Sequence, residues 1–119
     1  DRILADMLAS LNNVEDIGTR YWNGEFVSNS VTIRAAEQSI RAEIHHLARD
    51  SADLFGDVKV ARDLCDDEVK SLRMLVTGGN FGDGQSMVSA DIVLKVRTSA
   101  GDARRMLRNQ RDGLKRRFL

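Results

Sequence analysis

The sequence predicts an all-α domain, folded as an antiparallel four-helix bundle with a long C-terminal helix. First, the 119 residues contain no proline, so no residue blocks the formation of long helices. Second, apolar residues recur at three- and four-residue steps in four separate segments, which is the period of an amphipathic helix. Third, most connections between these segments are short, and short connections make consecutive helices antiparallel neighbours.

The composition fits a single helical domain that spans residues 1–119. A chain of this length folds around one core, and 42% apolar residues with zero formal net charge are typical of a globular protein. One cysteine excludes a disulfide within the chain, and no apolar run approaches the roughly 18 residues that span a bilayer. Because the chain begins at Asp1 and not at methionine, we expect a soluble fragment of a slightly longer chain.

The first helix is predicted over residues 2–22. Asn23 and Gly24 then form a stop signal, since both accept the left-handed conformation that ends helices, and Ser28 or Ser30 is expected to cap the next helix. The apolar stripe of the first helix consists of Leu4, Met7, Leu8, Leu11, Val14 and Tyr21.

The second helix is predicted over residues 31–55 and is closed by Gly56, and the third lies within residues 57–77. A break of the third helix near residues 65–67 is an alternative. The stripe of the second helix consists of Ile33, Ala36, Ile40, Ile44, Leu47, Ser51 and Leu54. The stripe of the third consists of Ala61, Leu64, Cys65, Leu72, Leu75 and Val76. The alternative N-caps of the third helix are Asp57, Asp63 and Asp66.

The fourth helix is predicted to follow the longest loop and to run to about Arg117. Four glycines within residues 78–84 cannot form a helix interior, and Ser86 or Ser89 is expected to cap the helix after them. Such a helix is about 45 Å long, whereas a compact domain of this size is about 35 Å across, so its end is expected to project. Its heptad-like seam consists of Val93, Val96, Ala100, Ala103, Leu107, Leu114 and Phe118.

Charge is unevenly distributed along the chain. Residues 97–119 hold eight basic and two acidic side chains, whereas residues 1–96 hold ten basic and sixteen acidic ones. We expect the projecting part of the fourth helix to dock an acidic protein partner or to self-associate. The predicted partner-binding residues are Arg104, Leu107, Arg108, Arg111, Leu114, Arg116 and Phe118. One alternative is a cationic helix that binds the phosphates of nucleic acid or lipid headgroups, and another is a merely solvated face.

The two histidines, His45 and His46, suggest two chemical hypotheses. Imidazoles and nearby carboxylates can ligate a metal, but adjacent side chains on a helix point about 100° apart, so we predict neither a metal site nor a cofactor. Arg41 and His46 also resemble the Arg-x4-His spacing of the HEPN family of small helical ribonucleases. That resemblance implies an arginine that stabilises the phosphodiester and a histidine that acts as general acid or base. It covers six residues, and Ala42 stands where the family commonly has a polar residue.

Three further features are interpreted as structural. The glycine-rich segment could present backbone amides to an anion, but it lacks the Lys-Ser/Thr ending of a P-loop and is expected to be a crossover connection. Cys65 lies on an apolar stripe, where cysteine behaves as a small hydrophobe. Tyr21 and Trp22 are expected to seal the core at the end of the first helix.

Three short segments together resemble those of a group of small bacterial proteins. The segments are Tyr21-Trp22-x-Gly24, Ile44-His45-His46-Leu47 and Val76-Thr77-Gly78-Gly79-Asn80-Phe81. The chain resembles, through them, proteins with an N-terminal membrane-spanning segment and a helical cytoplasmic domain of unassigned function. The resemblance implies a cytoplasmic domain at the inner face of the membrane, anchored through a segment outside this sequence, and it implies no activity. We therefore predict a non-enzymatic interaction or structural module.

Overall fold

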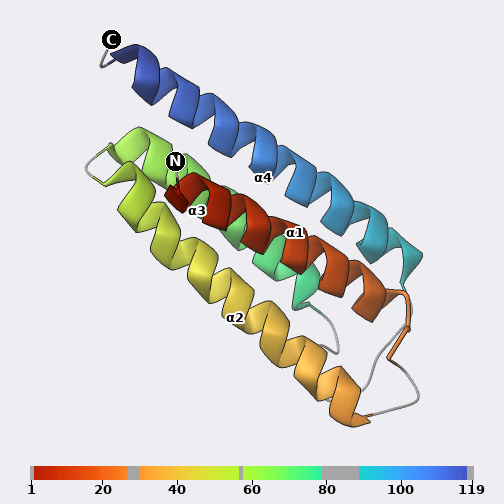
Figure 1. Ribbon diagram of the computed structural model, residues 1–119. Helices are drawn as coiled ribbons and strands as arrows, with labels where there is room; N and C mark the ends of the chain where they lie inside the picture. The colour runs from red at the N-terminus through yellow and green to blue at the C-terminus, as the bar shows by residue number, and fades with distance from the viewer. Residues whose placement is uncertain (1, 27–29, 57, 79–88, 118–119) are drawn as a thin grey trace.

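The protein is all-helical in the residues that the computed structural model describes, which are residues 2–26, 30–56, 58–78 and 89–117. The helices are α1 (Arg2–Trp22), α2 (Ser30–Phe55), α3 (Lys59–Val76) and α4 (Ala90–Arg117), as Figure 1 shows. These bounds confirm the all-α prediction and agree with the predicted segments to within two or three residues at most ends.

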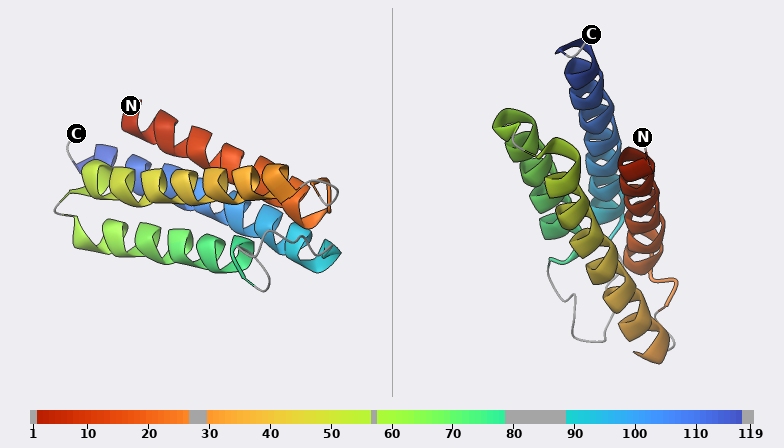
Figure 2. Two further views of the ribbon diagram at one scale, coloured as in Figure 1. Left: turned by 90° about the horizontal axis from the view of Figure 1, so that it is seen from below. Right: turned by 60° about the vertical axis from the view of Figure 1, so that its left-hand side comes forward.

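The helices lie side by side in an elongated molecule of 54 × 23 × 19 Å. Both α1 and α3 pack mainly on α2 and α4, so the α1–α4 pair and the α2–α3 pair form opposite sides of the molecule. Along α1 and α3 the chain runs from upper left to lower right in Figure 1, and along α2 and α4 it runs back. As its length of about 42 Å leads one to expect, α4 reaches past the first residue of α1 in both Figure 1 and Figure 2.

The predicted apolar stripes form the core. Nearly all of their described members are buried or half-buried, because one side of each amphipathic helix faces the other three helices. Leu64 is the exception, with 42% of its surface exposed, since it lies at the edge of the buried stripe of α3. Large side chains that are fully buried include Met7, Leu11, Tyr21, Ile40, Leu47, Leu72 and Leu107. No helix in the described part of the chain has both the length and the apolar character that crossing a membrane requires.

The predicted glycine stops and one predicted cap are confirmed. Gly24 and Gly56 have positive φ angles of 78° and 50°, which glycine adopts without the steric cost of a Cβ atom. At the start of α4, the hydroxyl oxygen of Ser89 accepts a hydrogen bond from the backbone N–H of Ile92 at 3.2 Å. Ser30 is the first residue of α2, whereas the alternatives Ser28 and Ser86 lie outside the described residues.

Two of the three aspartates that were predicted as alternative N-caps of α3 do not cap it. Val58 precedes the helix and forms no side-chain capping hydrogen bond, whereas Asp63 and Asp66 lie inside the helix. The helix starts before them because its buried stripe begins at Ala61, and burial of that stripe outweighs one capping hydrogen bond. The third alternative, Asp57, lies outside the described residues, and α3 runs through residues 65–67 without the break that we considered.

Tyr21 and Trp22 join the ends of three helices. The indole N–H of Trp22 donates to the backbone oxygen of Val76 at 2.9 Å, and the backbone oxygen of Trp22 accepts from the N–H of Ser89 at 2.8 Å. Tyr21 packs edge-on against Trp22, with ring centroids 5.2 Å apart, and its hydroxyl donates to the buried carboxylate of Glu37 at 2.8 Å. The pair therefore seals the core where α1 and α3 end and α4 begins, as predicted.

Candidate interaction surfaces

Six of the seven predicted partner-binding residues lie in the second half of α4, but those whose side chains are described do not share one surface. Leu107 is buried, whereas Arg108 is exposed and Arg111 half-buried. The backbone of α4 is described as far as Arg117. The side chains of Leu114 and Arg116, and Phe118 as a whole, lie outside the described residues.

The expectation that Leu107 projects toward a partner is wrong. Only 1% of its surface is exposed, and it belongs to the core of the bundle. The same seam buries Val96, Ala100 and Ala103 inside the molecule. A heptad-like spacing does not distinguish a seam inside a bundle from a seam between two chains, because helices pack by similar rules in both.

Arg104 is also not available to a partner, because it connects α4 to α1. Its Nε donates to the side-chain oxygen of Asn12 at 2.8 Å, and its Nη2 forms an ion pair with the carboxylate of Glu15. The side chains of Arg104 and Glu15 are only 21% and 25% exposed, so water screens this pair less than it screens the other ion pairs. Arg104 therefore holds α4 in place beside α1.

Arg104 belongs to a row of cations that we call the α4 basic flank: Arg97, Arg104, Arg108 and Arg111. Steps of seven, four and three residues keep these side chains on one side of the helix. Within the described part of the chain, Arg97, Arg108 and Arg111 form neither ion pairs nor side-chain hydrogen bonds. The flank therefore contains one arginine that is bound to α1 and three that form no such bond with the described residues.

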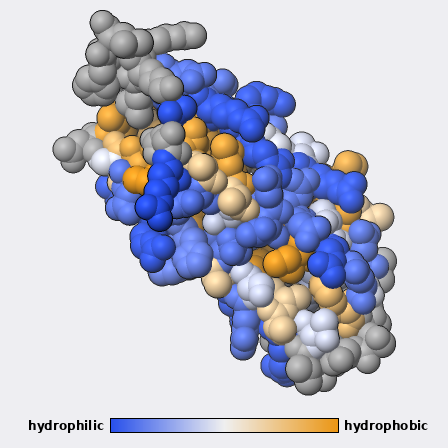
Figure 3. Space-filling view, viewed as in Figure 1, coloured by the Kyte–Doolittle hydropathy of each residue, from blue (hydrophilic) through white to orange (hydrophobic). Residues whose placement is uncertain are grey.

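Apolar surface accompanies the α4 basic flank. Leu8 of α1 is half-buried and lies four and seven residues before Asn12 and Glu15, so it shares their side of the helix. Figure 3 shows hydrophobic side chains reaching the surface at the end of the molecule where α1 begins and α4 ends. A partner docked on the flank would thus meet both positive charge and hydrophobic surface.

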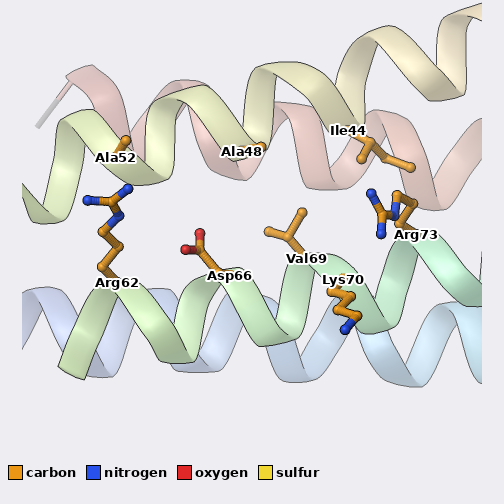
Figure 4. Close-up of a pocket in the computed structure, with 8 residues that line it drawn as sticks. All are labelled: Ile44, Ala48, Ala52, Arg62, Asp66, Val69, Lys70 and Arg73. Atoms are coloured by element: carbon orange, nitrogen blue, oxygen red, sulfur yellow. The ribbon is translucent and has the colours of Figure 1, made fainter. Parts of the chain in front are cut away.

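An open groove runs between α2 and α3, on the opposite side of the molecule. Its central part has a volume of about 360 Å³, and Figure 4 shows the side chains that line it. They are Ile44, Ala48 and Ala52 of α2, and Arg62, Asp66, Val69, Lys70 and Arg73 of α3. A hollow of about 480 Å³ shares Ile44, Ala48 and Arg73 and extends the groove to Arg41, His45 and Thr77. We call the whole feature the α2–α3 groove.

The arginines and the apolar side chains occupy different parts of the α2–α3 groove. Ile44 and Val69 are buried at its floor, whereas Arg62 and Arg73 stand at the two ends of its central part (Figure 4). Asp66 lies between them and accepts a hydrogen bond from the hydroxyl of Ser51 at 3.2 Å. No local pattern in the sequence predicts this site, because its residues come from two helices. The signal that could have indicated the groove is the pair Arg62 and Arg73, which are eleven positions apart on one helix.

The groove separates the two residues of the HEPN-like hypothesis. Arg41 and His45 line it, but His46 does not. Five residues turn a helix by about 140° relative to the starting direction, so Arg41 and His46 point to different sides of α2. The structure therefore places Arg41 in the groove and His46 outside it. Nor do three or more His, Cys, Asp or Glu side chains gather as a metal site among the residues that the structure describes.

Cys65 is buried against the α2 side of α3, as its place on the apolar stripe predicted. Burial raises the pKa of its thiol, the carboxylates of Asp66 and Glu68 act in the same direction, and a hydrogen bond with Ser51 acts against them. A thiol of this kind is a weak nucleophile, because the reactive species is the thiolate.

The raised pKa of Cys65 predicts a loss of stability at high pH. The unfolded thiol ionises near its ordinary pKa of about 8.5, whereas the folded thiol stays protonated to higher pH. The stabilisation is therefore complete below about pH 8.5 and declines as the pH rises toward the folded pKa. In urea unfolding at pH 7.5 and 9.5, Cys65→Ala should lose less stability over this interval than the parent protein. Equal losses would contradict the prediction.

Comparison with known proteins does not assign either surface. No protein-family model, no curated protein and no solved structure matches this chain.

Proposed function

We propose that this chain is an antiparallel four-helix bundle that acts as a non-enzymatic interaction module and docks an acidic protein partner on the α4 basic flank. The observation that carries the proposal is the row of arginines on α4. Arg104 is bound to α1, whereas Arg97, Arg108 and Arg111 on the same side of the helix have no ion-pair partner among the described residues.

The fixed position of Arg104 prepares the flank for binding. Its bonds to Asn12 and Glu15 join α4 to α1 at the middle of the row. Arg97 and Arg108 therefore project from a backbone that is already held, and less conformational entropy is lost when a partner orders them. The planar guanidinium of arginine is also suited to bidentate hydrogen bonds with carboxylates.

Charge alone would give weak binding. An exposed ion pair contributes about 0–1 kcal/mol, so three arginines provide about 3 kcal/mol at most, which corresponds to a Kd above 1 mM. The half-buried Leu8 beside the flank offers the apolar contact that tighter binding requires. We therefore expect the partner to present both carboxylates and an apolar side chain.

Site-specific crosslinking in the cell of origin tests this proposal. Benzoylphenylalanine, a photoreactive amino acid, would replace Arg108 on the flank or Asp53, which is exposed on α2, as the control. We expect a crosslinked protein partner from position 108 and none from position 53. The double variant Arg97→Glu/Arg111→Glu should reduce the yield at position 108 at least fivefold.

Three outcomes would overturn the proposal. Equal yields at positions 108 and 53, or no product at either, would remove the flank as a docking site. A product of twice the mass of the chain would replace the acidic partner with a second copy. A product that ribonuclease or deoxyribonuclease removes would assign the flank to nucleic acid. Affinity for nucleic acid should then fall about 40-fold between 50 and 200 mM salt, if three phosphates are contacted.

A further inference from the structure

We propose that the α2–α3 groove docks an acidic amphipathic helix from a partner protein. The groove lies on the side of the bundle opposite the α4 basic flank, so the inference does not depend on the function proposed for that flank. It rests on the shape of the floor and on the spacing of the two arginines.

The floor of the groove can receive a helix. Ala48 and Ala52 are four residues apart on α2, so their small side chains follow one another along the edge of the groove. Ile44 and Val69 form the apolar floor between the helices, and in Figure 4 Val69 points toward Ala48. Interaxial distances between packed helices are about 8–10 Å and depend on the side chains at the contact, so small side chains such as these allow a close approach.

The arginines set the length and the pattern of the occupant. Arg62 and Arg73 are eleven residues apart, which is about 16 Å along α3. Eleven residues are also close to three whole turns, so both arginines face the same side of α3. A helix lying along the groove would match them with carboxylates at positions i and i+11. Apolar side chains at i+4 and i+7 of that helix would meet the floor.

A helix fits the groove better than nucleic acid does. The carboxylate of Asp66 lies between the two arginines and would repel a phosphate backbone that follows the groove. Beside Asp66 the floor is formed by the apolar Ile44 and Val69, and no aromatic side chain among the residues lining the central part could stack on a base. The groove therefore has an arginine at each end and an apolar floor between them, with Asp66 beside that floor. This pattern complements a helix whose carboxylates lie at its ends and whose apolar side chains lie between them.

A second copy of this chain is a poor occupant. Acidic residues eleven positions apart occur at 91 and 102, and again at 57 and 68. Between the first two stand Lys95 and Thr98, which are not apolar. Between the other two stands Ala61, which is 2% exposed because it belongs to the core of its own bundle. We therefore assign the groove to a different protein.

A pair of designed peptides tests the inference on the whole chain. Both are 18-residue, acetylated and amidated alanine-rich helices with leucine at positions 7 and 10. One carries glutamate at positions 3 and 14, and the other carries lysine there. We expect the chain to bind the glutamate peptide at least tenfold more tightly than the lysine peptide in fluorescence anisotropy. In two-dimensional NMR, the amide signals of Ala48 and Ala52 should shift.

Charge reversal in the groove provides the decisive variant. Arg62→Glu/Arg73→Glu changes two exposed side chains, so its circular dichroism spectrum should match that of the parent. It should lose at least tenfold in affinity for the glutamate peptide and gain affinity for the lysine peptide. The matched control Arg97→Glu/Arg108→Glu removes the same charge from the α4 basic flank and should change the affinity less than twofold.

Several results would overturn the inference. The first is that the glutamate peptide does not bind at 1 mM, and the second is that the two double variants lose equal affinity for it. The third is that the amide signals that shift on binding do not include those of Ala48 and Ala52. Displacement of the peptide by single-stranded RNA whose own binding needs Arg62 and Arg73 would assign the groove to nucleic acid. A failure of the crosslinking at position 108 would not change these results, because the peptides test a different surface. Either proposal can therefore fail without the other.

Discussion

Replacing Trp22 with alanine is expected to lower the free energy of unfolding by about 3–5 kcal/mol. Trp22 is 2% exposed, and its ring packs edge-on against Tyr21. The substitution removes this buried surface, and it also removes the indole donor from the backbone oxygen of Val76. A domain of this size has about 5–15 kcal/mol of stability in total, so the loss is a large share. Urea unfolding, followed by circular dichroism, measures it.

The variant Trp22→Phe separates the two contributions. Phenylalanine keeps an aromatic ring in the core but has no N–H, so the oxygen of Val76 loses its indole donor. We expect this variant to lose about 1–3 kcal/mol, which is less than the loss in Trp22→Ala. If both variants were as stable as the parent, the end of α1 would not be held against α3 in the way that the structure shows.

The features that the sequence predicted are those that depend on nearby residues. The stripe from Leu4 to Tyr21 repeats within one helix, and Gly24 ends that helix through its own backbone freedom. Such signals need no knowledge of the other helices. The start of α3 shows their limit. A capping aspartate competes there with the burial of Ala61 and Cys65, and burial depends on α2 and α4.

The surfaces depend on contacts between residues that are distant in the sequence. The sequence alone therefore could not show which charged residues are bonded within the protein and which are available to a partner. Arg104 and Glu15 are 89 positions apart, and no local pattern indicates that one binds the other. The α2–α3 groove likewise appears only when Ala48 is placed opposite Val69. The charge pattern of α4 correctly indicated a row of cations. It did not indicate which of them the protein uses internally.

Leu107 and Arg108 show how sharply burial changes along α4, and substitutions at these adjacent positions should differ widely in effect. Leu107→Ala is expected to cost about 2–5 kcal/mol, since Leu107 is 1% exposed in the core. Leu107→Asp adds the desolvation of a carboxylate with no partner, which costs several kcal/mol more. The sum approaches the whole stability of such a domain, so we expect Leu107→Asp to be largely unfolded at 25 °C.

The matched control is Arg108→Glu, which reverses a charge on an exposed side chain one position further along. Its free energy of unfolding should remain within about 0.5 kcal/mol of the parent value. Circular dichroism in urea measures stability in each variant, and light scattering measures its association state. A surface role for Leu107 makes the opposite prediction, since Leu107→Asp would then keep its helix content and change only the association state. That result would place Leu107 at an interface between chains. Loss of the fold would instead place Leu107 in the core that holds the α4 basic flank in position.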